Sequence, residues 1–161
     1  MNIMNAKQEY LVKELWVLAW NASVQRADVY RSGTKHGSED VRLFSESLIS
    51  YLSSQVIPSY SRGMVKEEQH YQHIDELVAY ANSVGERVLG EFGYKYGVAQ
   101  ELLNLALTYH WCLGLVTEPP HCPVDRIVID KTTYRGTNWT EIQRRSEYQV
   151  IIEDIKRRTG T

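Results

Sequence analysis

Histidine and cysteine, the side chains that most often bind zinc in proteins, occur in two groups in this sequence. The residues are His70, His73, His110, Cys112, His121 and Cys122. His110 and Cys112 lie two positions apart in a helical pattern and therefore point in nearly opposite directions, and adjacent side chains rarely converge on one ion. The spacing therefore predicts no metal site, and no cofactor is expected.

Arg31 and His36 have an R-x4-H spacing, which resembles the motif of the HEPN family of helical ribonucleases. In that family the two residues stand on a helix, where both can reach one phosphate. Here the stretch RSGTKHG contains two glycines and predicts a loop. The spacing alone is weak evidence for nuclease chemistry, and we assign none.

Asp125 is the most specific candidate for chemistry, because Pro123 stiffens the chain just before it and a short apolar run, RIVI, follows. Two interpretations are open. Asp125 can be the N-cap of one turn of helix, which is a sufficient structural reason for an aspartate. Alternatively, a carboxylate held rigidly at a cleft can stabilise positive charge on a sugar, or orient a water, as an N-glycosidic bond breaks.

The segment from Gly90 to Ile129 resembles the helix-hairpin-helix DNA glycosylase superfamily. The resemblance rests on FGYKYGVAQELLNLAL at residues 92–107 and on CPVDRIVI from Cys122. It implies a DNA-associated protein on a diverged scaffold, with Asp125 as the catalytic acid. The hairpin would bind a phosphate of duplex DNA through free backbone N–H groups at Gly93 and Gly97, beside Lys95.

Two departures from that family bear on activity. Lys95 replaces the second glycine of the hairpin pattern, and the lysine of family members with lyase activity falls at Gly97. A Schiff-base mechanism is therefore not expected. If the protein is an enzyme, the resemblance implies a monofunctional DNA glycosylase-like hydrolase, and an inactive relative is equally compatible with these residues.

The charge distribution adds a possible nucleic-acid surface. Residues 1–125 have a net charge of −5, whereas residues 126–161 have a net charge of +3 within a total of −2. We therefore expect Arg126, Arg144 and Arg145 to contact DNA, if any residues do. The alternative is a solvated helix face whose basic residues favour the negative end of the helix dipole.

The second hypothesis is a non-catalytic protein-interaction factor, for instance an accessory or defence-related protein. It rests on eleven Tyr and four Trp in a slightly acidic chain, since such aromatics are enriched at interfaces. PPHCPVD and its surroundings also resemble a group of bacterial helical proteins whose activity is not established. That resemblance implies one local cluster, formed by Trp111, Pro120, His121, Cys122, Pro123, Asp125, Asn138, Trp139 and Thr140.

The elements that would position these residues are helices. Apolar residues recur at helical spacing in five stretches, so we expect an all-α fold, a single compact domain over residues 1–161 with about five to seven helices. One proline-rich irregular segment is expected, at residues 115–125. Ser38 should cap the second helix and Pro58 should end it, Gly114 should stop the helix from Val98, and Ser146 with Gln149 should form a capping box.

No stretch approaches the roughly 18 consecutive apolar residues of a membrane span, and the N-terminus has no signal pattern. We therefore expect a cytoplasmic protein without a membrane partner. Two cysteines are too few for a disulfide framework.

Overall fold

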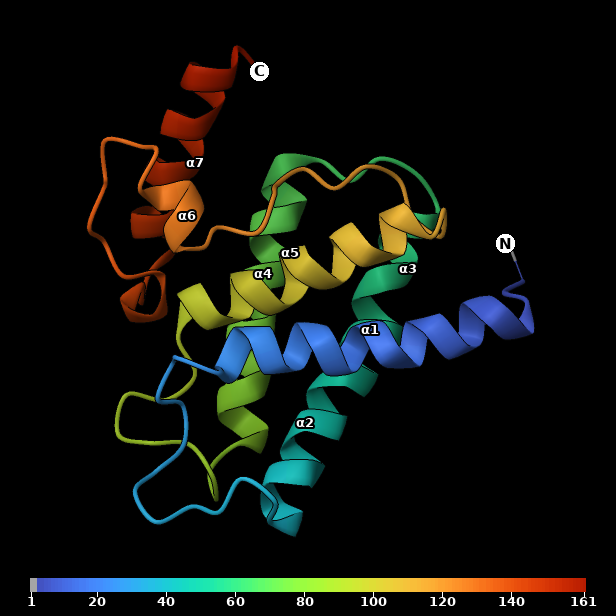
Figure 1. The fold of residues 1–161 in the computed structure, drawn as a ribbon, viewed down its shortest axis with the longest axis vertical. Helices are drawn as coiled ribbons and strands as arrows, with labels where there is room; N and C mark the ends of the chain where they lie inside the picture. The colour runs from blue at the N-terminus through green and yellow to red at the C-terminus, as the bar shows by residue number, and fades with distance from the viewer. Residues whose placement is uncertain (1–2) are drawn as a thin grey trace.

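The computed structural model describes residues 3–161 and confirms an all-α fold (Figure 1). The chain forms, in order, α1 Ala6–Val24, α2 Glu39–Tyr51, the π-helix η1 Leu52–Val56, α3 Ile57–Ser61, α4 Glu67–Val84, α5 Tyr96–Cys112, α6 Arg126–Ile129, the 3-10 helix η2 Trp139–Glu141 and α7 Arg145–Thr159. One cluster of buried side chains joins all the long helices into a single core.

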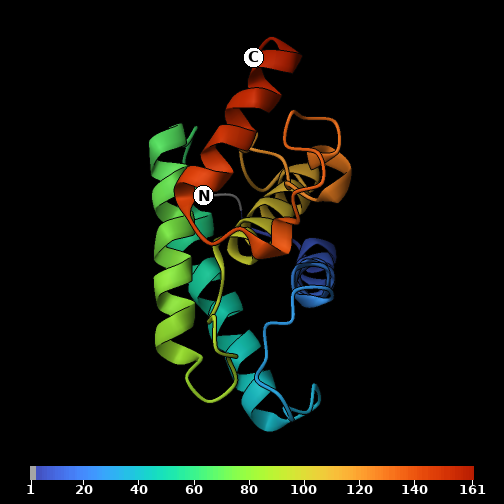
Figure 2. The same ribbon diagram turned by 90° about the vertical axis from the view of Figure 1, so that its left-hand side faces the viewer.

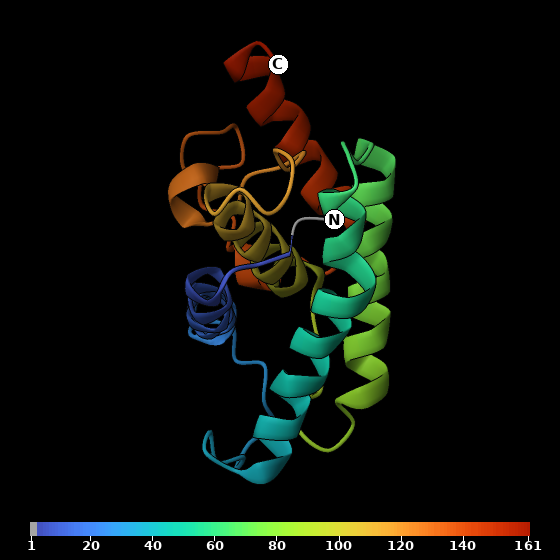
Figure 3. The same cartoon turned by 90° about the vertical axis from the view of Figure 1, so that its right-hand side faces the viewer.

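Helix α5 lies at the centre of this core. Most of its residues are buried, and it packs against α1, α4, η2 and α7. Helix α1 runs beside α5 in the opposite direction, so that Gln8 at the start of α1 bonds to the carbonyl of Leu113 after α5. Figures 2 and 3 show α1 on the outside of the molecule, with α5 between α1 and α4.

Two helix signals in the sequence are confirmed. The Ser38 hydroxyl accepts a bond from the N–H of Val41 at 3.3 Å. Gly114 has a φ of +71° and follows the C-cap Leu113. The N–H groups of Gly114 and Leu115 donate to the carbonyls of Trp111 and His110, which is the Schellman pattern that satisfies the end of a helix.

The prediction that Pro58 ends the second helix was wrong. The helical path continues from α2 through η1 and α3 to Ser61. In the π-helix the N–H of Ile57 donates to the carbonyl of Leu52, five residues back. Pro58 thus falls in the first turn of α3, where its missing N–H removes no helical hydrogen bond.

The start of the last helix was also predicted wrongly. Helix α7 begins at Arg145, and the carboxylate that reaches back is that of Glu147, which accepts from the N–H of Arg144 at 3.2 Å. Ser146 lies inside the first turn and is exposed. The charged acceptor is a stronger partner for a free N–H group than the amide of Gln149 would be.

Candidate functional site

The glycine-rich hairpin is closed by internal hydrogen bonds. The N–H of Gly93 donates to the carbonyl of Gly90 at 3.1 Å, and the N–H of Gly97 donates to the carbonyl of Ile142 at 2.9 Å. The expectation that these N–H groups are free to bind phosphate was therefore wrong. The side chain of Asn82 further holds the hairpin against α4, through the N–H and the carbonyl of Tyr94.

Gly97 is in tight contact with the segment before α7. A Cβ atom at this position would lie 1.8 Å from the carbonyl oxygen of Trp139, which no side chain tolerates. The place of the family's lyase lysine is thus filled by backbone. Lys95 forms an ion pair with Glu141 at 2.8 Å, which brings the hairpin and η2 to one side of the molecule.

Asp125 is the N-cap of α6, as one of the two interpretations predicted. Its Oδ1 accepts a hydrogen bond from the N–H of Val128 at 3.0 Å. The side chain is half-buried, and it does not line the three cavities described below. The geometry therefore gives Asp125 a structural role.

The proline-rich segment is held by α5 through one side-chain amide. The buried Gln100 donates from Nε2 to the carbonyl of Val124 at 2.9 Å and accepts at Oε1 from the N–H of Val124 at 3.1 Å. A backbone N–H can only donate and a carbonyl can only accept, so the orientation of this amide is fixed. Gln100 therefore pins the turn that precedes Asp125.

The fixed orientation of the Gln100 amide determines which atoms donate and which accept in a buried series of hydrogen-bonded side chains. Asn104 must direct Nδ2 to Gln100 Oε1, at 3.1 Å, and so presents Oδ1 to His70 Nε2, at 2.8 Å. His70 is therefore protonated at Nε2 and accepts at Nδ1 from the hydroxyl of Tyr60, at 2.7 Å. Tyr60 in turn accepts from Nδ1 of His73 at 2.8 Å. Each partner along this branch has one consistent role.

A second branch leaves Asn104 toward α7 and the surface. The other proton of Asn104 Nδ2 goes to the hydroxyl of Tyr148 at 3.0 Å, and that hydroxyl donates to His121 Nδ1 at 2.8 Å. Nε2 of the neutral His121 then carries the proton and lies 3.4 Å from Glu67 Oε1, which is a long contact. Glu67 also pairs with Lys156 at the rim.

Burial has the largest effect on the pKa of His70 and of His121. It lowers the pKa of His70 to about 3, and the nearby imidazole of His121 lowers it further. Burial likewise lowers the pKa of His121 to about 4, although Glu67 acts in the opposite direction. Both rings are therefore neutral at pH 7. Because unfolding frees them to bind protons, acidification below about pH 6.5 destabilises the fold.

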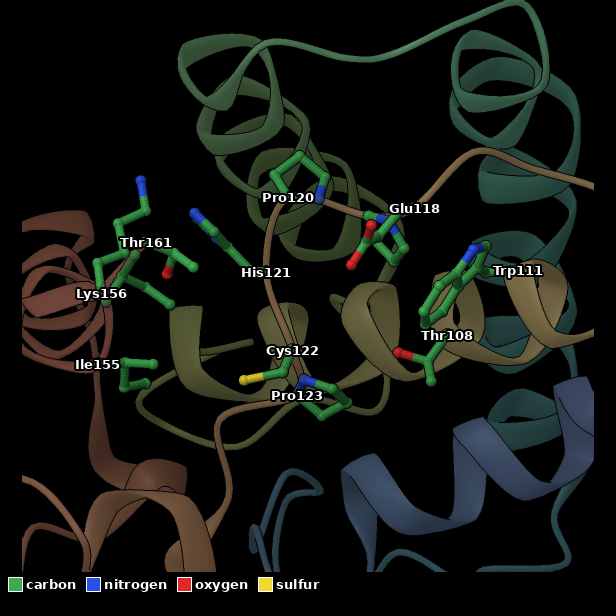
Figure 4. A pocket seen from close by; sticks show the side chains of 12 residues that line it. Thr108, Trp111, Glu118, Pro120, His121, Cys122, Pro123, Ile155, Lys156 and Thr161 are labelled. Atoms are coloured by element: carbon green, nitrogen blue, oxygen red, sulfur yellow. The ribbon is translucent and has the colours of Figure 1, made fainter. Parts of the chain in front are cut away.

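A cavity of about 380 Å³ lies beside the proline-rich segment (Figure 4). Its walls come from the end of α5, from residues 118–123 and from α7, and include Thr108, Trp111, Pro120, Cys122, Ile155 and Lys156. Trp111 is 45% exposed. Burial, with nearby Asp125 and Glu101, raises the pKa of the Cys122 thiol, so that it stays protonated and is a poor nucleophile.

Two polar hollows lie on another side of the molecule. The larger, of about 950 Å³, is formed by residues 24–36 and the hairpin, and includes Arg31. The smaller, of about 360 Å³, is formed by residues 126–140 and includes Arg126. Arg26 lines both, so the hollows adjoin.

The predicted basic contacts are spread and mostly paired with acids. Arg126 lies 3.7 Å from Asp130, and Arg144 lies 3.4 Å from Glu147. Arg145 bonds Glu68 at 2.6 Å and stacks on the ring of Tyr71. The basic cluster at the end of α7 is likewise paired and mostly neutralised, because Lys156 pairs with Glu67, and Arg157 and Arg158 share Asp154.

The residues that the sequence suggested for metal binding or nuclease chemistry do not come together in one site. Within residues 3–161 no three His, Cys, Asp or Glu side chains are grouped closely enough for a metal ion. His110 donates from Nδ1 to the carbonyl of Ala106 in its own helix, at 2.7 Å, and both cysteines are free thiols. Arg31 and His36 lie in the predicted loop, where Arg31 bonds backbone carbonyls at Leu89 and Glu86.

The predicted cluster around the proline-rich segment is divided between two places. Trp111 lies with Pro120, His121 and Cys122 at the cavity, whereas Trp139 is buried against Gly97 with Asn138 and Thr140 nearby. The hydrogen bond expected near His121 is present and goes to Tyr148.

Glu101 was missed by the sequence reasoning, because it occupies an apolar helix face one residue after Gln100. It is only 6% exposed, and its Oε2 has no hydrogen-bond partner. Burial raises its pKa to about 7, and the charge of Asp125 adds to this effect. A glutamate among the apolar residues of a central helix is the only sequence signal for a buried carboxyl group of this kind.

No helix within residues 3–161 has the length and apolar character needed to cross a membrane. Comparison with known proteins gives no match: no family model, no curated protein and no solved structure is significantly similar to this chain.

Replacement of Tyr148 by Phe should destabilise the protein, because it leaves one proton of Asn104 and Nδ1 of His121 without partners. Each unpaired buried group costs about 1–3 kcal/mol. The matched control is Tyr96→Phe, since Tyr96 packs against Tyr148 and its own buried hydroxyl has no partner. Urea unfolding of both variants measures the difference, and equal free energies of unfolding would contradict the network.

Replacement of Glu101 by Gln should increase stability more at pH 8 than at pH 5. The folded protein keeps a proton on Glu101 that the unfolded chain releases above about pH 4.5, so the wild type loses stability as the pH rises through about 7. Unfolding at both pH values checks this, with the exposed Glu91→Gln as the baseline for the same chemical change. A pH-independent difference would be contrary to this account.

Proposed function

We propose that this protein is a non-catalytic interaction protein, which receives an apolar side chain of a protein partner in the cavity beside the proline-rich segment. The observation that carries the proposal is the half-exposed Trp111 at the edge of a cavity with apolar walls at Pro120 and Ile155. Buried aromatic anchors that fill a concave site supply most of the binding energy at many interfaces.

The surroundings of the cavity support binding rather than catalysis. The hydrogen bonds from Gln100 to Val124 and from Tyr148 to His121 hold the proline-rich wall of the cavity in place. Little conformational entropy is therefore lost when a partner binds. The thiol of Cys122 is held protonated, and Asp125 is engaged as a helix cap. Neither group is available as a nucleophile or a base in this arrangement.

Replacement of Trp111 by a photo-crosslinking phenylalanine analogue should yield a covalent adduct with one protein in the source cell, whereas the same analogue at Phe92 should not. Phe92 is a suitable control because it is 71% exposed and lies on the hairpin. With the purified partner, Trp111→Ala should weaken binding at least about tenfold, as expected for an aromatic anchor. Identical adducts at both positions, or unchanged affinity, would argue against this site.

Nucleic-acid binding is the second candidate, because Arg26 joins the two polar hollows next to the hairpin and carries no acid partner among the described residues. In this proposal, the diverged helix-hairpin-helix scaffold binds the sugar-phosphate backbone of DNA through arginine side chains. Backbone N–H groups of the hairpin take no part, since they are already bonded.

Duplex DNA, intact or with an abasic analogue, should bind with an affinity that falls steeply between low and moderate salt. Arg26→Glu should reduce this affinity more than Lys13→Glu, which makes the same charge change on an exposed site of α1. Asp125→Asn, which keeps a capping side chain, should leave binding unchanged. Fluorescence anisotropy measures all three, and an absence of salt-sensitive binding would remove this candidate.

A further inference from the structure

Helix α1 carries apolar side chains on both of its faces. Leu15, Trp16, Ala19 and Trp20 are buried against the core. The opposite side exposes a second apolar set: Tyr10 at 65%, Leu11 at 45%, Val17 at 56% and Leu18 at 57%. This outer face is open along the helix, since Figures 2 and 3 show α1 at the edge of the molecule. Apolar side chains that recur along the exposed side of a helix indicate a surface that another protein element covers.

The outer face has a regular pattern. Tyr10 and Leu11 are repeated seven residues later by Val17 and Leu18, and Lys7 and Glu14 precede the two pairs at the same spacing. A seven-residue repeat places these side chains on one stripe of the helix. Neither Lys7 nor Glu14 forms an ion pair with any residue of the 3–161 range.

We propose that a second copy of this chain covers the outer face, with the two α1 helices antiparallel. The two-fold axis passes between residues 10 and 11, so that Tyr10 packs on Leu11 of the second copy. Val17 and Leu18 then lie opposite Met4 and Ile3, two exposed apolar residues just before α1. Lys7 then lies opposite Glu14 of the second copy, and the symmetry makes this contact twice. A two-fold interface of this kind is self-complementary, with each contact repeated.

The charges select this arrangement over its alternatives. A parallel pair would place Lys7 against Lys7 and Glu14 against Glu14. An antiparallel pair displaced by one repeat would bring two copies of Glu14 together on the axis, between the apolar layers. Like charges at such positions oppose association. Only the register centred between Tyr10 and Leu11 joins apolar pairs and opposite charges.

The self-association is independent of the cavity at Trp111 and of the hollows at Arg26, because its residues lie between Ile3 and Leu18 and line none of them.

Sedimentation equilibrium of the full chain over a concentration series tests the proposal. The wild type should be a concentration-dependent dimer. Lys7→Glu and Glu14→Lys should each weaken dimerisation at least about tenfold, because each variant creates two like-charge contacts. Lys13→Glu is the matched control, since Lys13 is exposed on α1 but lies off the stripe, and it should leave the dissociation constant unchanged.

Two further samples identify the register. The double variant K7E/E14K should dimerise like the wild type, because the opposite charges are exchanged. An equimolar mixture of the two single variants should form heterodimers, in which both contacts are again attractive. A monomeric wild type at all concentrations would overturn the proposal, and dimers that ignore both charge reversals would overturn the antiparallel register. Circular dichroism of each variant shows that the helical fold is kept.

Discussion

The two hydrogen bonds between the side-chain amide of Gln100 and the peptide groups of Val124 are the constraint on which the centre of this structure depends. They join the central helix to the proline-rich segment, and they leave only one orientation for the amide. This orientation in turn determines how the Asn104 amide is oriented and which ring nitrogen of His70 carries the proton. A buried network whose first amide is fixed by backbone groups, and whose other members follow from it, favours one packing of the surrounding helices over near alternatives.

Local signals in the sequence predicted the helices well. Ser38, Gly114 and Asp125 act within a few residues of the turns that they cap, so their effects can be read without the fold. The predictions made from Pro58 and Ser146 were wrong for a related reason. A π-turn before Pro58 and the carboxylate of Glu147 changed where the free N–H groups fall, and the sequence pattern does not distinguish these variants.

The buried network could not be predicted, because its members come from five separate segments. Tyr60, His70, Gln100, His121 and Tyr148 have no mutual spacing that a single sequence reveals. The spacing of the histidines and cysteines predicted no metal site, but it did not reveal that His70, His73 and His121 bond tyrosines and an asparagine. Gly97 shows the opposite case: the glycine was noticed for the hairpin, but it is required by close contact with Trp139, far away in the chain.

Several residues of α5 hold other segments of the molecule in place. Gly97 contacts η2, Gln100 holds the proline-rich segment, and Asn104 joins α4 to α7. The residues that most resemble a catalytic apparatus therefore stabilise the fold. The groups that remain free for recognition lie at the periphery, at Trp111 and Arg26 and on the outer face of α1. A rigid centre with unengaged aromatic, basic and apolar edges supports the proposed binding role, because a preorganised surface loses little conformational entropy when a partner binds.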